Sequence, residues 1–268
     1  THTSGYAMYG NNCLNYIGKT SALSNQGMVS LYKRSLSNEY IIYRHILSPN
    51  AAADEKFGST VQFAGNDILI VAAEQSDSSG KLYQFEYTVT DDILQWTTGV
   101  DFGTQGAAND YLGKTISTSK DGSTIAVTVY GDDSIIVYSN NNEYIDTITP
   151  GTTSSDYSIS VSNDGTYIAV GNKTASTSQG TVKIYKKDDN EYTLYQTINS
   201  RAPEGSEGYG TQVAFMNDYE TLLITSSNGD TIVDGTTVID SGRIDVYDVY
   251  DTNSVSYTHL TLPTILLV

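Results

Sequence analysis

The stretch "FGSTVQFAGNDILIVAAEQSDSSGKLYQF", residues Phe57 to Phe85, decides the fold of this chain. It opens with an aromatic-glycine pair and a half-alternating segment, followed by the polar turn "AGND" and the fully apolar run "ILIVAA". A further segment, "GKLYQF", starts at a glycine and ends in an aromatic residue. Alternation, tight polar turns and short apolar runs are typical of consecutive β-strands joined by hairpins.

The same pattern recurs along the chain with a period of about 50 residues. A glycine or aspartate comes five positions before an aromatic residue in "GMVSLY", "GKLYQF", "DSIIVY", "GTVKIY" and "GRIDVY". An apolar run precedes each of these segments, and such runs suit strands that are buried on both faces. Four short antiparallel strands per unit at this period predict an all-β fold, a β-propeller made of four-stranded antiparallel blades.

The repeats indicate about five visible blades and an incomplete ring, because propellers often hold more blades than this chain can supply. The predicted blades span residues 5–47, 57–100, 112–149, 157–198 and 209–254, within a single propeller segment from 1 to 254. Residues 255–268 contain no acidic residue, lysine or arginine, and "VSYTHLTLPT" resembles a translated sequencing adapter. We therefore expect this tail to be foreign to the protein.

The charge balance narrows the classes of partner. Lysine and arginine number 14 against 31 aspartates and glutamates, a net charge of −17 at pH 7. Such a field disfavours nucleic acid and anionic membrane surfaces, and no apolar stretch is long enough to predict membrane insertion. One cysteine, Cys13, and few histidines leave no credible Ser-His-Asp or Cys-His arrangement for nucleophilic catalysis.

The stretch from Phe57 to Phe85 resembles the FG-GAP repeat of integrin-alpha-like propellers. The segment from "YGTQVAF" to "GRIDVY" shows the pattern again, with Tyr209 and Gly210 at the Phe-Gly positions, and "LGKTISTSKDG" follows it more loosely. The resemblance covers most of residues 5–250. It implies a role in adhesion or surface recognition, and we expect a secreted or cell-surface protein.

Calcium-binding members of that family carry several carboxylates in the first turn of the repeat, because the ion takes six to eight oxygen ligands. The turns of this chain carry one carboxylate each, which predicts a calcium-free, short-turn variant whose aspartates shape hairpins. These residues are Asp67, Asp121, Asp164 and Asp218. We expect no cofactor, and the weak candidates for a cation such as calcium lie in the longest loop, at Asp230, Asp234 and Asp240.

The long loops are predicted to share one face. A four-stranded meander sends its second and inter-blade connections to one side, and in this chain those connections are the long ones. We expect this face to be acidic and to bind the ligand. Its candidate binding residues are Asp54, Glu55, Glu74, Asp77, Asp110, Asp132, Asp133, Asp156, Glu204 and Glu207.

Two functions fit these observations. The leading hypothesis is a non-catalytic recognition or adhesion scaffold whose long-loop face binds a protein or glycan partner, and a basic partner would suit its charge. The alternative is a propeller glycoside hydrolase or lyase that uses paired carboxylates on the same face. The sequence singles out no such pair, so it predicts no catalytic residue.

Overall fold

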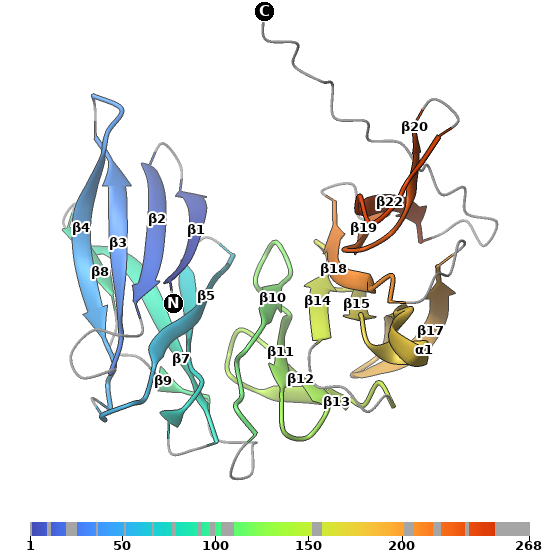
Figure 1. Ribbon diagram of the computed structural model, residues 1–268. Helices are drawn as coiled ribbons and strands as arrows, with labels where there is room; N and C mark the ends of the chain where they lie inside the picture. The colour runs from blue at the N-terminus through green and yellow to red at the C-terminus, as the bar shows by residue number, and fades with distance from the viewer. Residues whose placement is uncertain are drawn as a thin grey trace, which may run out of the picture. The chain divides into compact units, whose positions relative to one another are not determined.

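The computed structural model describes residues 2–9, 12–19, 26–35, 37–50, 52–65, 67–76, 79–90, 93–96, 100–102, 110–151, 157–200, 206–216, 221–233 and 236–249. The chain divides into two compact units, residues 1–149 and 150–268, and each is described by itself (Figure 1). Antiparallel sheets make up both units, and the helix found in the described ranges, α1 (Ala175–Ser178), has four residues. The all-β prediction is confirmed, whereas the predicted tail lies outside the described residues.

Unit 1 contains three sheets in which consecutive strands are neighbours (Figure 1). The first sheet consists of β1 (His2–Tyr9), β2 (Asn12–Lys19), β3 (Met28–Arg34) and β4 (Tyr40–Leu47). The second consists of β5 (Phe57–Ala64), β6 (Ile68–Ala73), β7 (Lys81–Thr90), β8 (Ile93–Trp96) and β9 (Val100–Asp101), which also pairs with β7. The third consists of β10 (Ile116–Thr118), β11 (Ile125–Val129), β12 (Ser134–Tyr138) and β13 (Tyr144–Ile148).

Unit 2 repeats this arrangement and adds a small hairpin. Its first sheet consists of β14 (Tyr157–Val161), β15 (Tyr167–Asn172), β16 (Thr181–Asp188) and β17 (Glu191–Asn199). Its second sheet consists of β18 (Tyr209–Phe215), β19 (Thr221–Ser226) and β22 (Arg243–Asp248). The hairpin of β20 (Thr231–Val233) and β21 (Thr236–Val238) is inserted between β19 and β22, within the longest loop.

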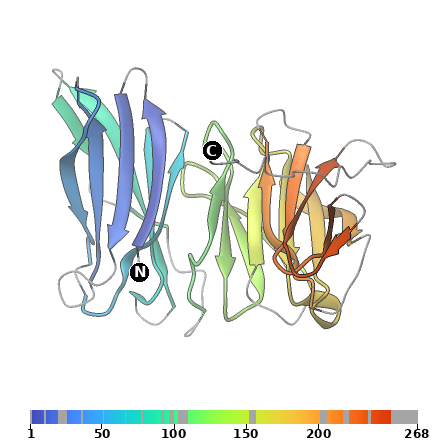
Figure 2. The ribbon, with the colours of Figure 1, turned by 45° about the horizontal axis from the view of Figure 1, so that its top comes forward.

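The sheet that contains β6 lies between the first and third sheets of unit 1 (Figure 2), and all six residues of β6 are buried. Its alternate side chains enter different hydrophobic clusters. Leu69 belongs to a cluster that includes Val29 of β3, whereas Ile70 belongs to a cluster that includes Ile125 of β11. The prediction that an uninterrupted apolar run marks a strand buried on both faces is therefore confirmed for β6.

A glycine at the start of a third strand touches the backbone of the next sheet. Gly27 and Gly180 have φ angles of +87° and +86°, and they form isolated parallel bridges with Phe57 and Tyr209, respectively. A Cβ atom on Gly180 would lie 2.0 Å from the carbonyl oxygen of Tyr209, so no side chain fits there. The glycine before a third strand thus contacts the aromatic residue that begins the first strand of the next sheet. We call this backbone contact the joint between two neighbouring sheets.

The single carboxylates of two first turns are used within the turns themselves. Asp164 Oδ1 accepts hydrogen bonds from Ser162 Oγ at 2.7 Å and from the Thr166 amide at 3.0 Å, and Thr166 Oγ1 donates to Oδ2 at 2.7 Å. Asp121 accepts the corresponding bonds from Ser119 and Ser123. These bonds hold the backbone of each hairpin, as predicted from the sequence.

We expect the Asp164→Ala substitution to lower the free energy of unfolding by about 1–2 kcal/mol near neutral pH. Partial burial acts to raise the pKa of Asp164, but the hydrogen bonds from Thr166 and Ser162 outweigh it and hold the pKa below its ordinary value of 3.8. The ionised carboxylate therefore stabilises the fold above that value, and this contribution is lost as the pH falls through the lowered pKa.

Urea unfolding at pH 7 and in steps below about pH 4 would test this expectation, since the difference between wild type and Asp164→Ala should shrink on acidification. Glu191, exposed at the start of β17, provides the control. Its replacement by alanine should change stability by less than about 0.5 kcal/mol. An Asp164→Ala effect that stays constant at every pH would contradict the assigned role of the carboxylate.

Candidate functional site

The structure separates the predicted binding residues by burial. The exposed fractions of Glu55, Asp110 and Glu207 are only 1%, 9% and 1%. Asp54 and Asp132 are exposed, and Glu74 and Asp133 are half-buried. Asp77, Asp156 and Glu204 lie outside the described residues. Several residues of the acidic face expected from the loop sequences are therefore buried inside the protein.

Glu207 lies in a buried polar cluster at the edge of the second sheet of unit 2. Its Oε1 atom accepts hydrogen bonds from Ser200 Oγ at 2.8 Å and from Ser226 Oγ at 3.1 Å, and it also pairs with Arg243 Nη2. Arg243 Nε reaches Asp245 Oδ1 at 3.1 Å. One guanidinium thus balances two buried carboxylates, while Glu207 Oε2 has no hydrogen-bond partner among the described residues.

Glu55 occupies the same place in the second sheet of unit 1. Its Oε1 atom accepts a hydrogen bond from Tyr83 Oη at 2.8 Å, and burial together with this bond raises the pKa of Tyr83. Its backbone oxygen accepts the Gln75 amide at 3.3 Å, just as that of Glu207 accepts the Asn228 amide at 3.1 Å. Both glutamates precede the aromatic residue of an inner strand by two positions.

This recurrence favours a structural role for Glu55 and Glu207. Ser48 and Ser200 each lie nine residues before the aromatic residue, Phe57 or Tyr209, so the whole spacing is repeated. A feature that recurs in two separate repeats belongs to the architecture, whereas a catalytic constellation has no reason to recur. In both places the glutamate links the start of an inner strand to residues of neighbouring strands and of the segments that follow them.

An exposed aromatic surface lies at the edge of the third sheet of unit 1, where β11 ends. The Gly131 amide donates to the backbone oxygen of Asp110 at 3.0 Å, which holds the segments around these residues together. Tyr130 is 40% exposed, and its ring meets that of Tyr111 edge to face, with ring centroids 6.2 Å apart. Lys114 Nζ lies 4.5 Å from the centroid of the Tyr130 ring, within the range of a cation–π contact.

Two carboxylates, Asp132 and Asp133, follow Tyr130 after a single glycine in the sequence. Asp132 is exposed, and its Oδ2 atom accepts a hydrogen bond from Ser134 Oγ at 3.2 Å. Asp133 has a φ angle of +51°, and its Oδ1 atom is buried without a hydrogen-bond partner among the described residues. Strained non-glycine conformations and unsatisfied polar atoms are both enriched at functional sites.

We name Tyr111, Lys114, Tyr130, Asp132 and Asp133 the tyrosine cluster. It combines a solvent-facing aromatic ring, a cation and two adjacent carboxylates at one sheet edge. This set can hold a sugar ring, accept hydrogen bonds from its hydroxyls and take up a proton. The structure thus brings together three of the predicted residues, Asp110, Asp132 and Asp133, at the ends of two segments.

The aromatic and cationic members of the tyrosine cluster were not predicted from the sequence. Tyr130 directly follows the apolar run of β11, and in that position the sequence alone suggests an aromatic residue of the core. The sequence feature that could have identified it is its position at the start of "YGDD", where a tyrosine precedes a glycine and two adjacent aspartates. Lys114 gives no such signal, because its proximity to Tyr130 arises from strand pairing.

The expected cation site in the longest loop remains a prediction. Asp230 Oδ1 accepts the backbone amide of Asp240 at 2.9 Å, which closes the base of the β20–β21 hairpin, and Asp234 lies outside the described residues. Among the residues that the structure describes, no group of three or more His, Cys, Asp or Glu side chains could hold a metal ion. In the same part of the chain, no helix has the length and apolar character needed to cross a bilayer.

Neither the models of known protein families nor the curated proteins give a match to the sequence. A provisionally assigned 6-phosphogluconolactonase from Bacteroides uniformis matches in structure with a TM-score of 0.62 and 14% identity, over 95% of this chain and 68% of that one. A provisionally assigned 6-phosphogluconolactonase from Bacteroides fragilis gives 0.56 and 12%, over 94% and 67%. Sqt1 from Chaetomium thermophilum gives 0.53 and 13%, over 91% and 67%.

These matches support a propeller-like all-β fold and correct the leading functional prediction. The prediction of a non-catalytic adhesion scaffold is wrong, because two of these three structures are named for an enzymatic activity and none is described as an adhesion protein. The predicted alternative, a propeller hydrolase, agrees better with them. The burial of Glu55 and Glu207 gives a physical reason for the error, since these carboxylates cannot attract a partner from solution.

Proposed function

We propose that this chain is a hydrolase of sugar lactones, built on a β-propeller of which about five blades are present as an incomplete ring. The observation that carries the proposal is the Lys114 ammonium over the Tyr130 ring, with the exposed Asp132 two residues further along the chain. The fold likeness to two provisionally assigned 6-phosphogluconolactonases supports the same class of reaction. The FG-GAP resemblance and a secreted or cell-surface location stay predictions that no comparison tests.

A lactone is the cyclic ester of a sugar acid, and its opening needs a base and a positive group. Asp132 would take a proton from water as the water oxygen bonds to the carbonyl carbon. Lys114 would stabilise the negative charge that develops on the carbonyl oxygen. The bond from the carbonyl carbon to the ring oxygen then breaks, and the proton passes to that oxygen, which leaves a free sugar acid.

Tyr130 and Asp133 would position the substrate. The exposed ring of Tyr130 offers a flat apolar surface to one side of the sugar. Asp133 holds a buried oxygen that has no hydrogen-bond partner among the described residues, so a hydroxyl of the substrate could donate to it. A glycoside hydrolase or lyase would use the same two carboxylates, and the difference lies in whether the bond that breaks is an ester or a glycosidic bond.

The reaction can be followed with glucono-1,5-lactone and its 6-phosphate in a pH-stat, above the spontaneous rate, with aryl glycosides measured in parallel. We expect Asp132→Asn to lower kcat by about 100-fold or more, as for loss of a general base, with a smaller change in KM. Glu143→Gln provides a matched control, because Glu143 is an exposed carboxylate at the other edge of the same sheet. Turnover of lactones no faster than in buffer, or full activity of Asp132→Asn, would refute the proposal.

A further inference from the structure

The outermost strand of three sheets carries a β-bulge at the same place. The register shifts between Leu31 and Tyr32, between Val137 and Tyr138, and between Ile184 and Tyr185. The extra residue on the outer strand is therefore Tyr43 in β4, Ile145 in β13 and Tyr195 in β17. A bulge re-aims the side chain of its extra residue, so these positions are comparable.

Only Tyr195 among these three is exposed. Tyr43 and Ile145 are half-buried, and Tyr43 packs against a hydrophobic cluster of unit 1. The Tyr195 side chain is 41% exposed, although its ring lies 5.7 Å from that of the buried Tyr167. An aromatic ring that packs on a buried ring and is also exposed to solvent offers a firmly held surface on which a ligand can stack.

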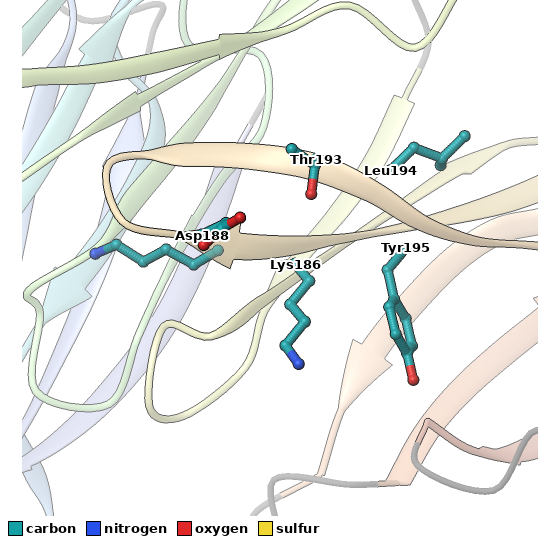
Figure 3. A pocket seen from close by; sticks show the side chains of 6 residues that line it. Lys186, Asp188, Thr193, Leu194 and Tyr195 are labelled. Carbon is teal, nitrogen blue, oxygen red and sulfur yellow. The ribbon is translucent and has the colours of Figure 1, made fainter.

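Tyr195 lines a groove on the hairpin of β16 and β17 (Figure 3). Lys186 of β16 is paired in register with Thr193 of β17, and Figure 3 shows the side chains of Lys186 and Tyr195 extending in the same direction. The other lining residues are Lys187, Asp188 and Leu194. The groove thus places an aromatic ring, a cation, a hydroxyl and a carboxylate around one space.

Lys186 and Lys187 bring two positive charges to the groove. Lys186 Nζ lies 5.8 Å from the centroid of the Tyr167 ring and 5.7 Å from that of the Tyr195 ring. Neither Lys186 nor Lys187 forms an ion pair with a carboxylate that the structure describes. With Asp188 as the one acidic lining residue, the groove is positive in a chain whose net charge is −17.

We propose that this groove binds a sugar that carries an acidic group. One face of the sugar ring would lie on Tyr195, the acidic group would meet the ammonium of Lys186, and hydroxyls would bond to Thr193 and Asp188. The positive charge of Lys186, held near two rings, favours an anionic sugar over a neutral one. This site lies within unit 2 and does not depend on the hydrolysis proposed for the tyrosine cluster in unit 1.

The test is a titration of the whole chain, followed by saturation-transfer NMR, with methyl glucuronide, glucose 6-phosphate and methyl glucoside. We expect an acidic sugar to bind with a dissociation constant on the order of 1 mM and the neutral glucoside to bind at least about tenfold more weakly. The two acidic probes distinguish a carboxylate from a phosphate as the preferred group, and a preference for either one supports the proposal.

Variants assign the binding to the groove. Tyr195→Ala should weaken the binding of the acidic sugar at least about tenfold, and Lys186→Met should abolish the preference for the acidic sugar over the neutral one. Tyr144→Ala is the matched control, because Tyr144 is an exposed tyrosine on the outer strand β13. Equal binding of acidic and neutral sugars, no saturation transfer from any probe, or a preference that survives Lys186→Met would overturn the proposal.

Discussion

Replacement of Gly180 by alanine is expected to lower the free energy of unfolding by about 3–5 kcal/mol. The new Cβ atom would lie 2.0 Å from the carbonyl oxygen and 2.6 Å from the amide nitrogen of Tyr209, and backbone atoms cannot turn away as a side chain can. The φ angle of +86° adds strain of about 1–2 kcal/mol for any residue with a Cβ. Because the contact joins two sheets of unit 2, the substitution would push these sheets apart and weaken the packing between them.

Gly151 is the matched control for this substitution. Its φ angle is also positive, at +71°, but a Cβ atom there would meet nothing within 4 Å. Gly151→Ala should therefore cost only the backbone strain, about 1–2 kcal/mol. Chemical denaturation of the two variants separates the cost of backbone strain from the cost of the clash with Tyr209. Equal losses of stability would show that the contact between Gly180 and Tyr209 contributes nothing.

Arg243→Met is expected to destabilise the chain by about 3–5 kcal/mol, because it leaves buried carboxylates without their counter-charge. The side chains of Arg243 and Glu207 are 9% and 0% exposed, and Asp245 is 7% exposed. Removing the guanidinium would force Glu207 and Asp245 to take up protons or admit water. The midpoint of urea unfolding for wild type and variant gives the loss directly.

Two further variants make this expectation specific. Glu74→Gln removes a half-exposed pair with Lys56, whose atoms lie 3.3 Å apart, and should cost less than about 1 kcal/mol. Glu207→Gln with Asp245→Asn in the Arg243→Met background should restore part of the lost stability, since no charge then remains buried. Failure of the neutral triple variant to recover stability would argue against charge imbalance as the cause of the loss.

The fold was predictable to the extent that it depends on local pattern. The apolar run of β6 and the hairpin turn at Asp164 follow from residue order alone, because alternation and turn chemistry act over a few positions. Gly180 and Tyr209 both belong to the repeated sequence pattern. The contact between them could not be predicted from that pattern, because it forms only when two sheets pack together.

The candidate sites were less predictable, because exposure is decided by segments that are distant in sequence. The sequence suggests that Glu55 is an exposed loop residue, yet it is buried, and it accepts hydrogen bonds from Tyr83 Oη and from the amide of Gln75, which follows β6. Lys114 meets Tyr130 only after β10 and β11 pair. The bulge at Tyr195 adds one residue to β17 and thereby changes which way the side chain of Tyr195 points. The composition of the strand gives no sign of this extra residue, so the direction of the ring could not be predicted from the sequence.

The joints between sheets have a consequence for how such a chain can diverge. The amides of Phe57, Leu112 and Tyr209 donate to the backbone oxygens of Gln26, Ser79 and Gln179, respectively, so main-chain atoms carry these contacts. Substitution of most side chains leaves such a contact intact, and only the neighbouring glycine is held to one residue type. Much of the sequence of a repeat could therefore change while these contacts between sheets are kept.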